Sequence, residues 1–132
     1  MRVTQITSCN GNGRDRLKGF VFRLSDPNDS SKGFIDLPIM GKTGSDDAST
    51  CYTDNVLYDV TSISATINNK GFVNSLQFGG LPSDSLVNSS GDSGHASKTW
   101  NFSQNPVVAF YGKTNSNFKI EQLGWITLNT EC

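Results

Sequence analysis

Side chains that build catalytic or metal sites are scarce in this chain. Its 132 residues include one histidine, His95, and three cysteines, Cys9, Cys51 and Cys132, with no CxxC spacing. A zinc site needs several such ligands at set spacings, and a catalytic site needs a nucleophile beside a base, a metal cluster or facing carboxylates. The sequence therefore predicts a protein that is not an enzyme and that holds no metal and no cofactor.

Charge of one sign and long apolar runs are lacking too. Only 17% of the residues are charged, the formal net charge is −1 and the pI is about 5.7. Without a basic field, nucleic acid is not an expected partner. No window approaches the roughly 20 apolar residues that span a bilayer, which argues against direct membrane insertion.

A signal segment is also lacking, since no basic stretch followed by an apolar one opens the chain. The length suits one domain and is too short for two. Abundant Ser, Asn, Thr and Gly are common in extracellular β proteins. We therefore expect a single domain, residues 1–132, excised from a larger secreted protein that sets the oligomeric state.

The cysteine count leaves the disulfide pattern open. One disulfide with one leftover thiol fits the three cysteines, and so do three inert thiols. Their spacing does not choose between these patterns.

Helical periodicity is almost absent, because Gly or Asn interrupts most windows. Short alternating runs dominate instead: VTQIT, GFVFRL, VTSISATI, VNSLQF, VVAFYG and GWITL. Alternation of apolar and polar residues between polar turns is typical of strands. The sequence therefore predicts an all-β domain.

An internal repeat organises these strands. Three segments share one plan: VTQITSCNGNGRDRLKGFVF from Val3, VTSISATINNKGFVNSLQFGG from Val60 and VVAFYGKTNSNFKIEQLGWITL from Val107. Each reads as a β-hairpin, and the connectors Ser25 to Thr50 and Leu81 to Lys98 leave room for one or two further strands each. We align Asp15-Arg16-Leu17 with Asn74-Ser75-Leu76 and Glu121-Gln122-Leu123, and Phe20 with Phe78 and Trp125.

A lone hairpin is marginally stable in water, but three hairpins around one axis bury their apolar faces together. The expected core residues lie at the inward positions of these hairpins. They are Ile6, Leu17, Phe20, Ile63, Leu76, Phe78, Phe110, Leu123 and Ile126.

The last repeat, NPVVAFYGKTNSNFKIEQLGWITL, resembles the last repeat of jacalin-related lectins. The middle repeat is similar to the hairpin of that family that carries an I-x-S-L-x-F strand, and GNGRD fits its Gly-x-x-x-Asp sugar-binding spacing. The resemblance implies a β-prism I of three four-stranded antiparallel Greek-key sheets with pseudo-threefold symmetry. It also implies lectin activity, and a parent such as a secreted bacterial cytolysin or a biofilm-matrix adhesin.

The chemistry of GNGRD suits a sugar. A carboxylate accepts charge-assisted hydrogen bonds from neighbouring hydroxyls, and glycines admit the close approach of backbone N–H groups. The best stand-ins for the Gly-Gly loop of the family are MGKTGSDD, Met40 to Asp47, and SSGDSGH, Ser89 to His95. The predicted carbohydrate-binding residues are Gly11, Asn12, Gly13, Arg14 and Asp15, joined by Gly44 and Ser45.

Further candidates rank below this set. They are Asp29 of the SDPNDSSKG loop, Asn74 and Glu121 as counterparts of Asp15, and Phe118 and Lys119 beside the last turn. For GNGRD itself the alternative is an ordinary hairpin turn, with Asp15 paired to Arg14 or Arg16 at the surface.

Two functions follow. The first is binding of neutral glycans, mannose-type or related, on glycoproteins or polysaccharide, which attaches the parent protein to cell-surface or matrix glycans. The alternative is a protein-interaction or structural adhesion module that keeps the prism without a sugar site. Asp15→Ala distinguishes them, because only a lectin has glycan binding to lose.

Overall fold

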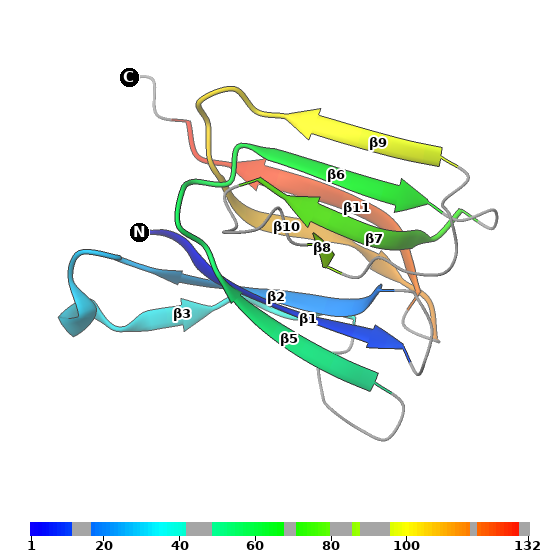
Figure 1. The fold of residues 1–132 in the computed structure, drawn as a ribbon, viewed down its shortest axis with the longest axis horizontal. Helices are drawn as coiled ribbons and strands as arrows, with labels where there is room; N and C mark the ends of the chain where they lie inside the picture. The colour runs from blue at the N-terminus through cyan, green and yellow to red at the C-terminus, as the bar shows by residue number, and fades with distance from the viewer. Residues whose placement is uncertain are drawn as a thin grey trace.

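The computed structural model describes residues 1–11, 17–41, 49–67, 71–79, 86–87, 96–116 and 119–129. These residues form three antiparallel sheets, with the first below, the second above and the third between them in the view of Figure 1. The predicted all-β fold is confirmed. No helix in the described part of the chain is long and apolar enough to cross a membrane.

The first sheet is a Greek key. Its strands are β1 (Arg2–Gly11), β2 (Leu17–Ser25), β3 (Phe34–Asp36), β4 (Met40–Gly41) and β5 (Ser49–Asn55). The order is β5-β1-β2-β3, in which β5 returns to pair with β1. β3 and β4 pair with successive parts of β2, so together they act as one interrupted edge strand.

The second sheet repeats this topology. It contains β6 (Ser62–Ile67), β7 (Val73–Phe78), β8 (Leu86–Val87) and β9 (Ala96–Asn101) in the order β9-β6-β7-β8. β8 and the start of β9 lie in the second polar connector, as β3, β4 and the start of β5 lie in the first. The connectors therefore supply the expected further strands.

The third sheet holds the last hairpin, β10 (Val107–Thr114) and β11 (Ile120–Thr127). Among the described residues this sheet has two strands and not the four that the resemblance implied. β1, β6 and β10 all point to the same end of the molecule, on the right in Figure 1. The strand bounds leave intervening segments of equal length: residues 12–16, 68–72 and 115–119.

The pairing registers reveal the threefold repeat directly. The residue three positions after the first Val of each repeat pairs with a residue on the returning strand. The three pairs are Ile6 with Phe22, Ile63 with Phe78, and Phe110 with Trp125. The first residues, Val3, Val60 and Val107, are all buried. Equivalent positions of the three repeats therefore carry equivalent side chains.

Three rings from these rungs meet at the centre of the molecule. The ring centroids of Phe22 and Phe78 lie 5.7 Å apart, those of Phe78 and Trp125 6.0 Å, and those of Phe22 and Trp125 6.2 Å. Near-equal separations mark the axis of the pseudo-threefold symmetry. Phe22 and Phe78 are fully buried and Trp125 is partly buried. A fully buried ring of this kind is worth about 1.5–3 kcal/mol in transfer from water, so the axis is a main source of stability.

The core confirms most of the predicted residues, with two corrections. Phe22, and not Phe20, is the counterpart of Phe78 and Trp125, although Phe20 is also buried beside it. Ile126 is 47% exposed, because it alternates with the inward-facing Trp125 in β11. Ile120 takes the buried position near the start of that strand.

Candidate functional site

Most of the predicted sugar-binding residues lie outside the described residues. Asn12, Gly13, Arg14 and Asp15 fall between β1 and β2, and Gly44 and Ser45 fall between β4 and β5. Gly11 is described as the last residue of β1. What the structure defines is therefore the position of the strand ends from which these two segments leave.

Those strand ends converge. Gly11 lies opposite Ser49, the first residue of β5, and the neighbouring Asn10 lies opposite Leu17, the first residue of β2. On the other edge of β2, Gly41 lies opposite Gly19. Both predicted segments are thus anchored at one end of the first sheet, although some 30 residues separate them in the sequence.

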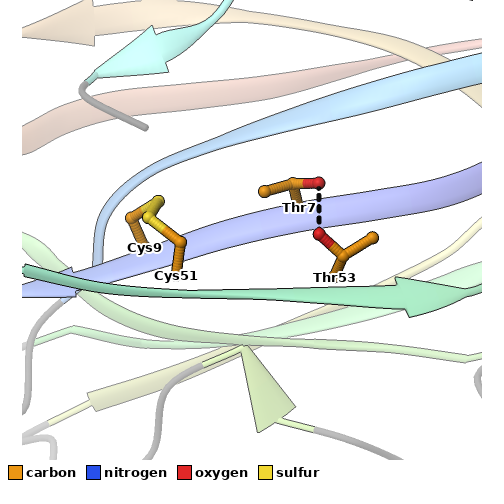
Figure 2. The surroundings of a disulfide bond; sticks show 4 residues. All are labelled: Thr7, Cys9, Cys51 and Thr53. Atoms are coloured by element: carbon orange, nitrogen blue, oxygen red, sulfur yellow. Dashed lines mark hydrogen bonds between the residues drawn. A yellow bond between two sulfur atoms is a disulfide. The ribbon is translucent and has the colours of Figure 1, made fainter. Parts of the chain in front are cut away.

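A disulfide holds this end together. Cys9 and Cys51 lie directly opposite one another on β1 and β5 and are covalently bonded, which resolves the pairing left open by the sequence. Cys132 lies outside the described residues. Figure 2 shows the pair two residues further along the ladder, where the hydroxyls of Thr7 and Thr53 are 2.9 Å apart.

A third rung extends the same pattern. The Gln5 amide nitrogen donates to Asn55 Oδ1 at 3.3 Å. Alternate residues of β1 are therefore tied to β5 by a disulfide, a hydroxyl pair and an amide pair in turn. This fixes the relative position of the strands that carry the predicted segments.

Gly41 shows how close the packing is where the second segment leaves. Its φ is +78°, in the left-handed region. A Cβ at this position would collide with the carbonyl oxygen of Lys18. Only glycine allows the backbone to approach β2 here and then turn into residues 42–48.

Each hairpin contains a β-bulge at the same position of the repeat. The registers step over Lys18 in the first hairpin, Asn74 in the second and Glu121 in the third. The sequence alignment of Asp15 with Asn74 and Glu121 is therefore wrong by three residues. Their structural counterpart in the first repeat is Lys18, and the threefold repeat no longer supports Asp15 as an equivalent acid.

The other two bulge residues differ in access. Asn74 is 3% exposed, so its amide is turned away from solvent and offers no surface to a sugar. Glu121 is exposed, and its Oε2 lies 3.9 Å from Lys113 Nζ on the paired strand. Glu121 therefore presents its carboxylate to solvent, whereas the Asn74 amide is buried.

Asn115 and Lys119, at the two ends of the segment between β10 and β11, are joined by two hydrogen bonds. The Lys119 backbone N–H donates to Asn115 Oδ1 at 3.1 Å, and the Asn115 N–H donates to the Lys119 carbonyl at 3.0 Å. Lys119 Nζ lies 5.1 Å from the ring centroid of Phe72, in the neighbouring hairpin. Lys119 thus links two repeats, and Phe118 lies outside the described residues.

Asp29 serves the local fold. Its carboxylate accepts a hydrogen bond from the Ser31 N–H at 3.1 Å and caps the short 3₁₀ turn η1 (Ser30–Lys32). The capping role uses one carboxylate oxygen as an acceptor. In the described part of the chain, no group of three or more His, Cys, Asp or Glu side chains is arranged to hold a metal ion.

No protein-family model and no curated protein sequence matches the chain. Solved structures do match it. Calsepa lectin in complex with a bisected glycan is 18% identical with a TM-score of 0.62, and covers 97% of this chain over 84% of its own. Calystegia sepium agglutinin is 16% identical with a TM-score of 0.64, and covers 98% of this chain over 84% of its own.

A mannose-binding lectin from Champedak is 12% identical with a TM-score of 0.68, over 98% of this chain and 84% of its own. The chain has the fold of these β-prism lectins. This confirms the predicted resemblance to jacalin-related lectins at the level of fold. Identities this low carry no residue roles across to this chain.

Proposed function

We propose that this β-prism domain binds neutral glycans, mannose-type or related, at the end of the first sheet where β1 meets β5. The observation that carries the proposal is the convergence of GNGRD and MGKTGSDD on the Gly11–Ser49 pair. The fold supports it, since the matching structures include a mannose-binding lectin and a lectin in complex with a glycan.

The chemistry of the two segments suits a pyranose. Asp15 supplies an acceptor for two adjacent hydroxyls, and Asn12 and Arg14 supply donors. Glycines at 11, 13 and 44 leave room for the sugar to approach the backbone. The Cys9–Cys51 disulfide joins the two strands next to this point and fixes the strand ends that carry the segments.

The proposed role is attachment of a parent protein to glycans on cell surfaces or in a matrix, outside the cell. The Cys9–Cys51 disulfide supports that location, because disulfides persist in oxidising compartments. One shallow site binds weakly, so firm attachment needs several copies of the domain in the assembled parent.

Exposed apolar side chains support the alternative of a protein-interaction module. Tyr52, Leu57 and Tyr58 are 56%, 53% and 72% exposed on β5 and just beyond it. A partner that covers them would not need a sugar site. Both functions are compatible with this fold, and a glycan-binding assay distinguishes them.

The test is a glycan array followed by calorimetric titration of the best ligand. Asp15→Asn keeps the side-chain size and removes the charge, and we expect it to weaken binding about 10- to 100-fold, as expected for a lost charge-assisted hydrogen bond. Glu121→Gln is the matched control, because Glu121 is an exposed carboxylate on another hairpin.

Three results are informative. Loss of binding in Asp15→Asn alone supports the proposed site. Loss in Glu121→Gln alone moves the site to the third hairpin. Absence of any glycan binding by the wild-type domain at high micromolar concentration rejects the lectin function and favours the interaction module.

A further inference from the structure

A second feature of the first sheet lies at its other end. An open hollow of about 280 Å³ sits among β1, β2, β5 and the loop before β3. Its nearest lining residue on β1 is Gln5, six residues before Gly11. At about 3.3 Å per residue, the hollow lies roughly 20 Å from the Gly11 end of the strand. Its volume suits one hexose ring, below the roughly 300–1,000 Å³ of drug-sized pockets.

We propose that this hollow is a second carbohydrate subsite, which takes one neutral hexose residue. The proposal rests on the lectin function for the class of ligand, but it uses the other end of the sheet and different residues. Its support is the charge balance, the aromatic rim and the rigidity of the lining.

Every charge around the hollow is already balanced. Arg23 makes two bonds to Asp36, from Nε to Oδ1 at 2.7 Å and from a terminal nitrogen to Oδ2 at 3.1 Å. Asp26 Oδ2 accepts from Lys32 Nζ at 3.2 Å. Because the Arg23 guanidinium is paired with Asp36, the hollow attracts an anion only weakly. Because Asp26 and Asp36 are both paired, it attracts a cation only weakly as well.

The remaining polar groups are neutral donors and acceptors. They are the hydroxyls of Thr4, Ser25 and Ser30 and the amides of Gln5 and Asn55. Hydroxyls and amides can both donate and accept, which matches the hydroxyls of a sugar. Asp26 adds an acceptor that stays ionised, because the Asn28 N–H, and then Lys32, holds the pKa of its carboxyl below the usual value.

Phe34 supplies an apolar surface at the rim. Its ring is 57% exposed, and the Arg23 guanidinium carbon lies 3.7 Å from its centroid. The cation fixes the ring in place, while most of the side chain is still open to solvent. The apolar face of a hexose ring can pack against such a ring while its hydroxyls reach the amides.

The lining is held before any ligand arrives. Gln5 is bonded to Asn55 at 3.3 Å, and the hydroxyls of Thr4 and Ser25 are 2.6 Å apart. Side chains that are already fixed lose little rotamer freedom on binding. The hollow therefore has the features of a preorganised, weak site for a neutral sugar.

The test is an NMR titration of the 15N-labelled domain with methyl α-mannopyranoside, with sodium phosphate and calcium chloride as separate arms. The side-chain amides of Gln5 and Asn55 report on the hollow, and the backbone amide of Gly11 reports on the loop end. We expect the sugar to shift both sets, and neither salt to shift the amides of the hollow.

Phe34→Ala should weaken the shifts at Gln5 and Asn55 about tenfold or more while leaving those at Gly11. Asp15→Asn should do the reverse. Tyr58→Ala, which removes an exposed ring outside the hollow, is the matched control and should change neither set. Phe34→Leu provides a second variant that keeps apolar bulk without a ring.

The outcomes separate the two proposals. Saturable shifts at Gly11 with Gln5 and Asn55 unmoved overturn the second subsite and leave the lectin function intact. Shifts confined to the hollow support the subsite and reject the loop site. A response to phosphate or calcium alone overturns the neutral-sugar assignment, and no response to any sugar overturns both proposals.

Discussion

Gly11, the last residue of β1, lies directly opposite Ser49, the first residue of β5. The pair is two residues from the Cys9–Cys51 disulfide on both strands. The chain leaves the sheet at Gly11 and enters it again at Ser49, so the segment after β1 begins where the segment between β4 and β5 ends. This proximity ties the proposed glycan site to the integrity of the β1–β5 ladder.

Removal of the disulfide should therefore affect stability and binding together. We expect Cys9→Ala/Cys51→Ala to lower the free energy of unfolding by about 2–5 kcal/mol, since the bond closes a loop with a sequence separation of 42. Urea denaturation measures this loss, and titration with the best glycan measures the accompanying fall in affinity. Cys132→Ala should leave stability unchanged, and an equal loss there would show a different pairing.

Gly41→Ala should destabilise the domain by more than the strain of a left-handed residue alone. That strain is about 1 kcal/mol, and here the new Cβ also meets the Lys18 carbonyl oxygen. Gly33→Ala is the matched control, because Gly33 has a similar φ of +71° with no atom within 4 Å of an added Cβ. Equal losses in the two variants, measured by chemical denaturation, would show that the close approach to β2 is unimportant.

The central ring cluster should be the most sensitive part of the core. Phe22→Ala removes a fully buried ring that lies within contact range of Phe78 and Trp125, and we expect a loss of about 3–5 kcal/mol. Tyr58→Ala, at 72% exposure, should stay within about 0.5 kcal/mol of wild type. Comparable losses in both would argue against the axis as the source of stability.

Acid should weaken the Arg23–Asp36 pair. The hydrogen bond and charge of Arg23 lower the pKa of Asp36 from its ordinary value of 3.8. A carboxyl whose pKa falls on folding stabilises the folded state above its unfolded pKa, and this contribution is lost as pH falls through the folded value. Stability should therefore decline below about pH 4.

Asp36→Asn isolates this effect. The melting temperature of the variant should fall less steeply than that of wild type between about pH 4 and pH 2. The pair is well exposed, so the difference should be small and should shrink further in high salt. Parallel acid limbs at low salt would mean that the pair contributes nothing to the pH dependence.

Alternation and repetition predicted the three hairpins, the extra strands of the connectors and most of the core. The register was harder. The polar-polar-Leu pattern matches Leu17 with Leu76, although the structural counterpart of Leu17 is Val73. The bulge does not cause this offset, because all three hairpins carry it at the same position. Polar residues at the same bulge position, Asn74 and Glu121, were the available signal.

Contacts between residues far apart in the chain could not be predicted from the sequence, for a different reason. Cysteine spacing does not specify partners, so Cys9 and Cys51 were recognised only once β1 and β5 were paired. The hollow likewise gathers residues from four separate segments, none of which forms a motif alone. Of its lining, only the SDPNDSSKG loop is a distinct feature of the sequence.

The equal spacing of the three turns has a practical consequence. Residues 12–16, 68–72 and 115–119 join strands that pack around the ring axis, and Phe72, Asn115 and Lys119 make the contacts described within and between two of these segments. Randomising the three segments with Phe72, Asn115 and Lys119 kept should therefore give a library of correctly folded variants with new recognition surfaces. The domain can in this way serve as a scaffold for engineered binders, with its specificity chosen by selection.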